Sequence, residues 1–332
     1  MKKKLLNLVL LMAIATTSNA INDNTVEIVY NGTTATITIA NNISSYITDN
    51  SDGSSHVKLI QSESFTGIDP DEDNEDGEIT YVLKGTSSDG EFYLEGSFKA
   101  TIELNGVTLT NPSGPAINIQ DGKRIAISVK NGTSNNLTDG VNDTYNGCLH
   151  CKGHTKFKGK GTLNVVGNSK HAIYSKEYIE VKNCTININA AEKDAIHCKE
   201  YFLMESGAVT FKGAVDDGIQ VELSNGSEPT GTTSNHDDEN SGNFYQQGGT
   251  LSISNYGGKA IKVDGSVKFA GGKQNFDTSD VETATDIEDS RISAKQDMPT
   301  AIYDLQGHKV SRTGRNLYIF RSKDATVKRI IK

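Results

Sequence analysis

Four carboxylates in the middle of the chain are the residues best suited to bind a metal ion. Asp216 and Asp217 are adjacent, Glu222 follows shortly after them, and Asp194 lies 23 residues before Asp217. If 23 residues make one turn of a repeating structure, Asp194 lies beside Asp217. Ca2+ binds about 6–8 hard oxygen ligands at roughly 2.4 Å. We therefore predict a Ca2+ site at these carboxylates, with a solvated acidic edge as the alternative.

Three lysines recur at nearly the same interval. Lys152, Lys176 and Lys199 are expected in one column on three successive turns of the repeat. Stacked like charges repel one another, and a polyanion along the column, such as a chain of uronates, would relieve that repulsion. The alternative is that Glu177 and Glu200, which follow two of these lysines in sequence, neutralise the column as a solvent-screened surface pattern.

Aromatic and imidazole rings flank the lysine column. Tyr174 and Tyr201 are candidate platforms for sugar rings, as is Tyr178, although exposed tyrosines also occur without a function. His150 and His197 each lie two residues before a lysine of the column. These two histidines are expected two turns apart, too far to share a metal ion, so we interpret them as surface histidines.

The spacing of these residues comes from an internal repeat. Segments 172–194 and 195–217 align without a gap, and a third repeat begins at residue 218. In each repeat, apolar residues alternate in three short bursts separated by turns rich in Gly, Asn, Lys and Glu. Period-two alternation is typical of strands with one buried face. Three strands per turn, without a helical stretch, predict an all-β fold, a right-handed parallel β-helix.

Equivalent residues of successive turns should stack about 4.8 Å apart. One predicted internal ladder contains Leu149, Ile173, Ile196, Ile219 and Ile261. A second ladder places Cys151 and Cys198 two turns apart, at about 9.6 Å, which is too far for a disulfide bond. We therefore predict free thiols at Cys148, Cys151, Cys184 and Cys198, with a zinc site at the first two as a less favoured alternative.

The chain divides into five segments. Residues 1–20 combine lysines, a short apolar run and small residues, which is typical of a signal peptide. Residues 21–105 are expected to form an N-terminal β region or cap, 106–277 the β-helix, 278–298 a linker, and 299–332 a small C-terminal β domain. We therefore predict export, to the extracellular space or the outer cell surface, and no membrane span, because spanning takes about 20 apolar residues.

Two acidic segments interrupt these elements. The run 69–78 does not have the spacing of an EF-hand loop, so a solvated loop is favoured over a Ca2+ site. The inserted segment 225–243 carries Asp237, Asp238 and Glu239 and leaves the same turn as Asp216. This insertion is a candidate to complete the ion site or to cover a ligand.

The overall charge limits the partners of the protein. The formal net charge is −9, and phosphate recognition needs a basic surface, so we expect no nucleic acid. An acidic protein instead favours divalent cations and a neutral or cation-bridged glycan. Nothing in the sequence calls for a second copy of the chain, and we expect a monomer.

The repeats resemble a family of carbohydrate-binding β-helix proteins typified by a clostridial cellulose- and pectin-binding protein. The segments that carry this resemblance are 104–109, 114–117, 131–140 and 216–219. The family is similar in shape to pectate lyases, and the resemblance implies binding of polygalacturonate-like or cellulosic glycans with Ca2+. An acidic pair before the Gly-Ile step is common in the family, but here it is intact only at Asp216-Asp217.

The C-terminal block 299–332 resembles the sorting domain of the type IX secretion system of Bacteroidetes. The match lies in its Ile-Tyr-Asp-x-x-Gly and Leu-Tyr-Ile elements, and it implies outer-membrane translocation and surface attachment or release by that machinery.

A catalytic function of the β-helix is less favoured than a binding function. A lyase needs a base near the ion site, and the candidates are Arg124, far away in the repeat, and Lys199. We predict a binding protein without catalytic residues. A Ca2+-dependent polysaccharide lyase and a structural adhesin that binds no glycan are the alternatives.

Overall fold

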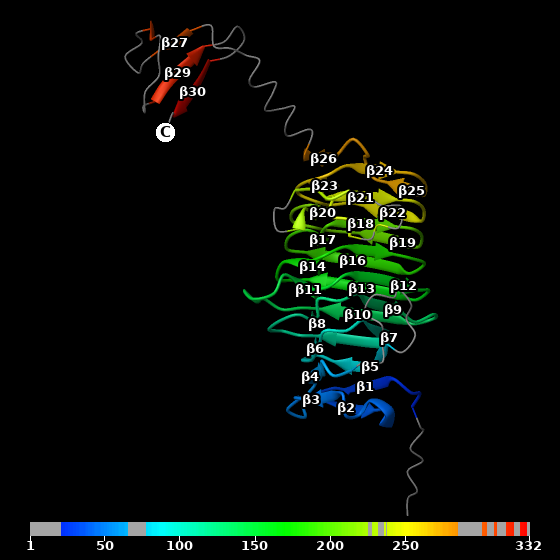
Figure 1. The fold of residues 1–332 in the computed structure, drawn as a ribbon. Coiled ribbons are helices and arrows are strands. Elements are labelled where there is room, and N and C mark those ends of the chain that lie inside the picture. Colours follow the sequence, from blue (N-terminus) through cyan, green and yellow to red (C-terminus); the bar gives the residue numbers. More distant parts are fainter. Residues whose placement is uncertain are drawn as a thin grey trace, which may run out of the picture.

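The computed structural model shows a long stack of strands followed by a separate small sheet (Figure 1). The described residues are 21–65, 78–224, 228–231, 236 and 238–284, with the strands at 301–303, 309–310, 317–321 and 326–330. The expected signal peptide, nearly all of the acidic run 69–78 and most of the expected linker lie outside these residues. None of the helices among the described residues is long and apolar enough to cross a membrane.

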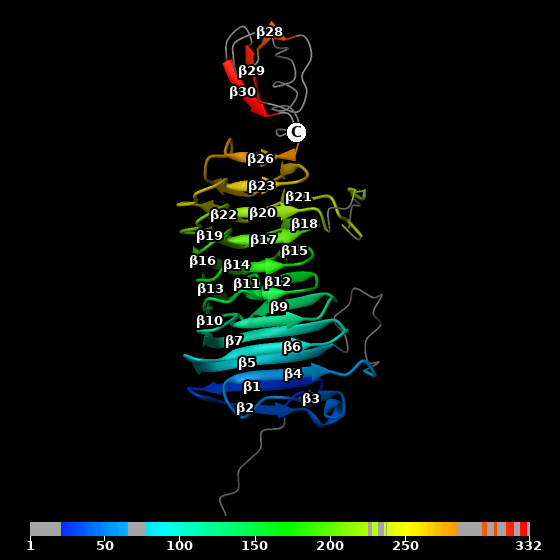
Figure 2. The same cartoon turned by 90° about the vertical axis from the view of Figure 1, so that its left-hand side faces the viewer.

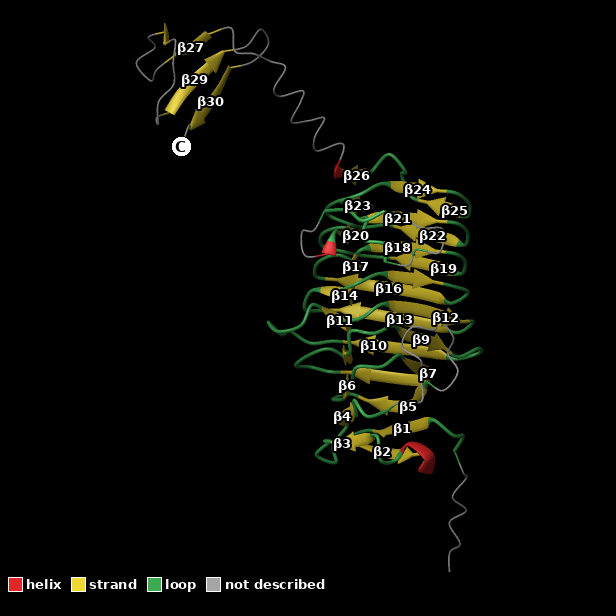
Figure 3. Cartoon of the chain, in the orientation of Figure 1, coloured by secondary structure: helices red, strands yellow, loops and turns green. Residues whose placement is uncertain are grey.

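The stack is a parallel β-helix with three strands per turn, as the repeat predicted (Figures 1 and 3). The first strands of successive turns lie in a ten-stranded sheet, here called the first-strand sheet: β8 (Ile117–Gln120), β11 (Gly147–Cys151), β14 (His171–Ser175), β17 (Ile196–Lys199), β20 (Ile219–Glu222), β23 (Ile261–Val263) and β26 (Val281–Thr283).

The second and third strands of each turn form the two arms of a sixteen-stranded sheet. The second-strand arm consists of β9 (Ile125–Val129), β12 (Thr155–Gly159), β15 (Ile179–Val181), β18 (Tyr201–Met204), β21 (Asn243–Gln246) and β24 (Val267–Phe269). The third-strand arm consists of β10 (Ser134–Thr138), β13 (Thr162–Gly167), β16 (Thr185–Ala191), β19 (Ala208–Phe211), β22 (Thr250–Ile253) and β25 (Lys273–Asn275).

The predicted internal ladder is confirmed. Leu149 pairs with Ile173, and the column continues through Ile196, Ile219 and Ile261. All five side chains are fully buried. The four cysteines are buried and free, as predicted; Cys151 and Cys198 lie two turns apart. Equivalent residues thus lie on adjacent strands throughout this part of the chain, in two turns of 23 residues, one turn of 24 and one turn of 42 that contains the insertion.

The parallel stack begins well before residue 106. The first-strand sheet continues through β6 (Glu91–Glu95) and β4 (His56–Gln61), while β5 (Ile79–Ser87) and β1 (Thr25–Asn31) stack on β7 (Ala100–Thr110) in parallel register. The predicted boundary between cap and helix thus falls inside β7. The cap itself is smaller: β2 (Thr34–Ile39) and β3 (Ile47–Asp49) run antiparallel to β1 and β4, with the short 3-10 turn η1 (Asn41–Ile43) between them.

A glycine explains how two strands per turn become three. The first half of β7 pairs with β9, and its last residues, from Thr108, pair with β10. Gly106 lies between the halves with φ +77°, a conformation that glycine adopts without steric cost. The long strand therefore bends there, and the next turns split it into the second and third strands.

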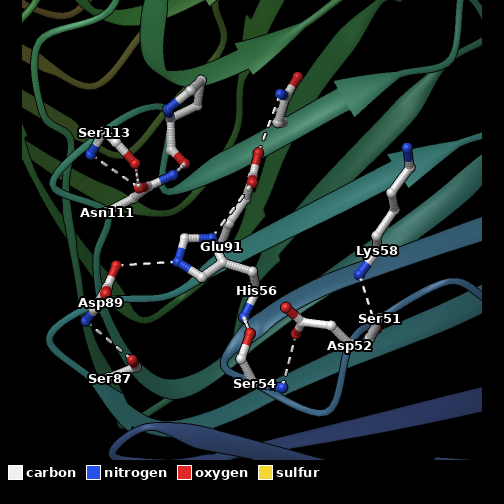
Figure 4. A network of polar contacts seen from close by, with 12 residues as sticks. Ser51, Asp52, Ser54, His56, Lys58, Ser87, Asp89, Glu91, Asn111 and Ser113 are labelled. Carbon is white, nitrogen blue, oxygen red and sulfur yellow. Dashed lines mark hydrogen bonds and ion pairs between the residues drawn. The ribbon is translucent and has the colours of Figure 1, made fainter.

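Polar side chains join the first turns at the end of the stack. Figure 4 shows His56 on β4 between two acidic residues, with Nε2 3.0 Å from Asp89 Oδ1 and Nδ1 3.8 Å from Glu91 Oε2. Glu91 also accepts a hydrogen bond from Asn118 on the next turn. The N-terminal turns are thus connected by side chains as well as by backbone ladders.

The C-terminal block forms a sheet of its own. It contains β27 (Ala301–Tyr303), β28 (Lys309–Val310), β29 (Leu317–Arg321) and β30 (Thr326–Ile330), in the order β28-β27-β29-β30. All neighbouring strands are antiparallel. The sequence pattern predicts three short strands in this block, and the structure has four there.

Candidate functional site

Three of the four predicted ion ligands meet where the chain enters the first-strand sheet. Asp194 precedes β17, and Asp216 and Asp217 precede β20 on the next turn. One oxygen from each of these carboxylates lies within 4.8 Å of the others. We call these three residues the acidic corner. Asp194 and Asp217 are buried, whereas Asp216 is exposed, so the corner opens to solvent on one side.

Asp217 has one oxygen satisfied and one without a hydrogen-bond partner. Its Oδ1 accepts a 2.6 Å hydrogen bond from the backbone N–H of Lys259, while Oδ2 is buried with only the Lys262 ammonium 3.7 Å away. Burial raises the pKa of Asp217, and the charges of Asp194 and Asp216 raise it further. A cation at the corner would remove both the repulsion and the unsatisfied oxygen.

A glycine on the next turn lets the backbone pass close to these carboxylates. A Cβ on Gly258 would collide with oxygens of Asp216 and Asp217. The sequence at 258 lacks the acidic pair of the turn before it, and the absence of a side chain at Gly258 lets Asp216 and Asp217 lie close against the backbone of the next turn. The donors present are carboxylate oxygens, which suit Ca2+.

Asp194 is engaged on its other side by two histidines. Its Oδ2 lies 3.0 Å from His197 Nδ1 and 3.2 Å from His171 Nδ1, and its Oδ1 accepts a hydrogen bond from the N–H of Asp217. Burial alone would raise the pKa of Asp194. The two histidines outweigh that effect and hold the pKa well below its usual range.

His171 was not among the predicted site residues. It occupies the position that Asp194 and Asp217 hold on later turns, since Ile173, Ile196 and Ile219 pair in register. In the sequence, residue 171 shows only as a position without the acidic residue that Asp194 and Asp217 supply. The repeat could have identified His171, because the residue two positions before Ile173 lies next to Asp194, which is two positions before Ile196.

Glu222 does not join the acidic corner. The strand β20 separates it from Asp217, and Glu222 lies at the other end of that strand. Its Oε2 is 3.2 Å from Lys199 Nζ and 3.5 Å from His197 Nε2. The hydrogen bond with His197 is the main cause that lowers the pKa of Glu222, to about 2. The predicted four-carboxylate cluster is therefore wrong: Glu222 reaches Asp194 through His197.

The lysine column exists, but its members differ. The backbone N–H groups of Lys152 and Lys176 bond to the preceding turn, and both side chains are exposed. Lys199 is half-buried and pairs with Glu222. Glu177 and Glu200 were expected to neutralise the column, yet both carboxylates face His154 Nε2, at 3.0 and 3.4 Å.

Tyr174 is not an exposed sugar platform, and the two neighbouring histidines are not surface histidines. The three rings form a stack on the outer face of the first-strand sheet, with centroids 5.1 Å apart for His150 and Tyr174 and 5.4 Å apart for Tyr174 and His197. Each residue is at most 8% exposed. Burial, together with the charge of Lys152, lowers the pKa of His150 to about 4, so this ring is neutral at pH 7.

A second ring ladder lies where the same strands end and the chain turns into the second-strand arm. The centroid distances are 4.0 Å from His154 to Tyr178, 4.6 Å from Tyr178 to Tyr201, and 5.2 Å from Tyr201 to His236. We call these four rings the covered ladder. Tyr201 is 1% exposed and donates a hydrogen bond to Glu180, so it is also not a free platform.

The insertion covers this ladder and not the acidic corner. It leaves the end of β20 and returns at β21, where the N–H groups of Ser241 and Gly242 bond to the carbonyl of Glu200. The prediction that it completes the ion site is wrong for its described residues, because the length of β20 lies between the two places; Asp237 lies outside the described residues. Figure 2 shows the insertion projecting from the stack near β21.

A pocket of about 250 Å3 lies between the insertion and the ladder. It is lined by His154, Tyr178, Glu200, Thr230, His236, Asp238, Glu239 and Asn240. Glu239 is buried and accepts a 2.7 Å hydrogen bond from Tyr245, and it also contacts His236 and Ser241. The insertion is thus attached through its own buried carboxylate.

The two cationic side chains considered as bases are both engaged. Arg124 is buried in an ion pair with Glu78, and Lys199 pairs with Glu222. A general base must reach a substrate proton, and Arg124 lies inside the stack, away from the acidic corner.

Comparison with known proteins matches this architecture to one family. A family model described as "Carbohydrate-binding domain-containing protein" matches residues 74–303, more than half of the chain. The chain belongs to this family. A curated carbohydrate-binding domain-containing protein of Acetivibrio thermocellus is 26% identical over 111 residues. That match spans 30% of this chain and 39% of the relative, so the relative is compared over well under half of its length.

A solved structure shows the same fold. It is titled a polysaccharide lyase-like protein from C. thermocellum, in a gadolinium derivative. The TM-score is 0.57 at 20% identity, and the alignment covers 78% of this chain and 94% of that one. The family member described here therefore shares the parallel β-helix with that protein.

Proposed function

We propose that this carbohydrate-binding domain protein binds an acidic, polygalacturonate-like polysaccharide along the first-strand sheet, with Ca2+ at the acidic corner. The lysine column carries the proposal. Lys152 and Lys176 are exposed on adjacent turns, about 4.8 Å apart in backbone spacing, so a glycan that runs along the stack meets an exposed cation on each of these two turns. Carboxylates of successive uronates are the matching charges.

The structure of the corner supports Ca2+ as the ion. Asp217 Oδ2 is buried without a hydrogen-bond partner, Asp216 is exposed, and Gly258 carries no side chain that would displace either carboxylate. When bound there, Ca2+ would neutralise the corner and present open coordination positions to a glycan carboxylate. Asp194 contributes charge at the same place, although its oxygens already face His171, His197 and the N–H of Asp217.

Reversal of one exposed charge tests the glycan surface. Lys176→Glu should lower the affinity for polygalacturonate at low salt by roughly fivefold, because one exposed charge contributes up to about 1 kcal/mol. Calorimetric titration measures this, and the difference should shrink at high salt. Lys160→Glu, an equal change at an exposed turn of the neighbouring coil, is the matched control. Equal affinities of the two variants would remove the lysine column from the proposal.

Removal of two carboxylates tests the ion site. The double variant Asp216→Ala plus Asp217→Ala should lose Ca2+ binding in calorimetric titration, because it removes the unsatisfied oxygen and the exposed one together. Glu192→Ala removes an exposed carboxylate near the corner and should leave the titration unchanged. A double variant that still binds Ca2+ like the wild type contradicts a site at Asp216 and Asp217. A glycan array run with and without EDTA then shows whether the ion is needed for sugar binding.

The terminal segments suggest where this binding takes place. We propose that residues 1–20 direct export and that the C-terminal sheet is a sorting module that brings the protein to the outer surface. Its short antiparallel strands are compatible with this role. Deletion of residues 299–332 should leave the protein in the periplasm of a host with that secretion system, and cell fractionation with antibody detection measures it. Unchanged surface display of the truncated chain would refute the sorting role.

A further inference from the structure

A second cluster shares Asp194 with the acidic corner but has different chemistry. His171, Asp194 and His197 each offer one ligand atom within 4.8 Å of the others, and all three residues are buried. They come from two adjacent turns: His171 begins β14, while Asp194 and His197 precede and lie on β17. The proposed Ca2+ site involves Asp216 and Asp217 on the other side of Asp194, and it does not involve the two histidines.

One carboxylate oxygen faces both ring nitrogens. Asp194 Oδ2 lies 3.0 Å from His197 Nδ1 and 3.2 Å from His171 Nδ1. Only the contact with His197 has hydrogen-bond geometry, and His171 Nδ1 is buried without a hydrogen-bond partner. The side chain of His171 is 9% exposed, so solvent does not satisfy this nitrogen. Buried polar atoms are seldom left in this state.

We propose that His171 Nδ1, His197 Nδ1 and Asp194 Oδ2 bind a divalent transition-metal ion, for which Zn2+ is the probe. Zn2+ binds nitrogen at about 2.0–2.1 Å and carboxylate oxygen at about 2.0–2.2 Å in a tetrahedral arrangement. Ligand atoms of such a tetrahedron lie roughly 3.3 Å from one another, close to the two nitrogen–oxygen distances seen here. Two imidazoles and one carboxylate favour this ion over Ca2+, which prefers oxygen alone.

The surroundings orient one of the rings for this role. The other ring nitrogen of His197, Nε2, lies 3.5 Å from Glu222 Oε2. A carboxylate on the far nitrogen fixes the orientation of a metal-binding imidazole and raises its basicity. The His197 ring is also stacked on Tyr174. Glu222, which does not join the acidic corner, thus acts here as a positioning residue.

Titration of the full chain with Zn2+, without a polyhistidine tag, tests the site. One ion should bind. His171→Gln and His197→Gln should each weaken Zn2+ binding by at least about tenfold, because even the loss of a residue that only orients a metal ligand has an effect of about that size. His154→Gln removes a histidine beside two carboxylates at the other end of the strands, and should leave affinity within about twofold. Co2+ in place of Zn2+ should give the visible absorption of a tetrahedral complex, which the His171 variant loses.

The outcomes separate this site from the Ca2+ proposal. Asp216→Ala plus Asp217→Ala should abolish Ca2+ binding and retain Zn2+ binding, whereas His171→Gln should do the reverse. Thermal melting in EDTA establishes that each variant is folded; if His171→Gln unfolds, His171→Gly, the residue type at the equivalent position 147, takes its place. No Zn2+ binding by the wild type, or binding that is lost with His154 and kept without His171, overturns the proposal.

Discussion

The two ends of four successive first strands, β11, β14, β17 and β20, carry different chemistry. At their beginnings, carboxylates and histidines converge in the acidic corner and its neighbouring cluster, and one side remains open. At their ends, the covered ladder stacks four rings, and the insertion encloses a pocket over them. Both ends have the same backbone register, so the difference lies in the residue types of each column and in one loop.

The two ends show that the position of a side chain and its exposure to solvent have different causes. The repeat positions both sets of side chains to within one strand spacing, because the ladders fix every turn relative to the next. Exposure is decided locally: Asp216 stays at the surface, whereas the insertion covers Tyr201, the residue we expected to be free. A column in a solenoid therefore specifies neighbours, but not accessibility.

The largest expected effect comes from breaking the framework that both ends share. Ile196 is fully buried between Ile173 and Ile219. Ile196→Ala should lower the free energy of unfolding by about 2–5 kcal/mol, measured by urea denaturation, and should weaken Ca2+ binding as well. Val141→Ala, at a side chain that is 76% exposed, is the control and should change stability by less than about 0.5 kcal/mol. Similar stability of the two variants would contradict a shared core.

A smaller effect is expected when only the covered ladder is altered. His236→Ala removes the ring that contacts Tyr201 and the partner of Glu239. Ring pairs contribute about 0.5–1.5 kcal/mol, and the loss should expose Tyr201. Because the chain contains no Trp, acrylamide quenching of tyrosine fluorescence measures this exposure directly. Glu228→Ala, exposed in the same insertion, is the control, and unchanged Ca2+ affinity should show that the two ends are independent.

The smallest expected effect is a pH dependence of stability that comes from His154, at the end of the strands with the covered ladder. Burial lowers the pKa of His154, but Glu177 and Glu200 outweigh it and raise the pKa from 6.5 to about 9. The folded state thus binds the proton more tightly than the unfolded state, so this stabilisation is complete below pH 6.5 and is lost as the pH rises through 9. Melting temperatures should fall over this range in the wild type and less in His154→Gln. Since the side chain is 37% exposed, solvent screening keeps the difference below about 1 kcal/mol; parallel curves would refute the assignment.

Much of the fold could be predicted because the period is visible in the residues themselves. The ladder from Leu149 to Ile261, the free thiols of Cys151 and Cys198 and the meeting of Asp194 with Asp217 all follow from the recurring pattern of apolar residues, with turns of 23 or 24 residues and one insertion. The N-terminal turns were missed as part of the stack because their long strands, β5 and β7, do not show the three-burst pattern.

What the sequence alone determined is therefore which residues share a column, since the same pattern of apolar residues recurs in each turn and marks equivalent positions even where the turn contains an insertion. The tertiary structure decided three further points: that His171 and His197 face one oxygen of Asp194, that Glu222 turns to His197 and Lys199, and that the insertion lies over Tyr201. These contacts join different columns or an irregular loop. They depend on side-chain direction and on the path of the chain between strands, and a repeat period specifies neither.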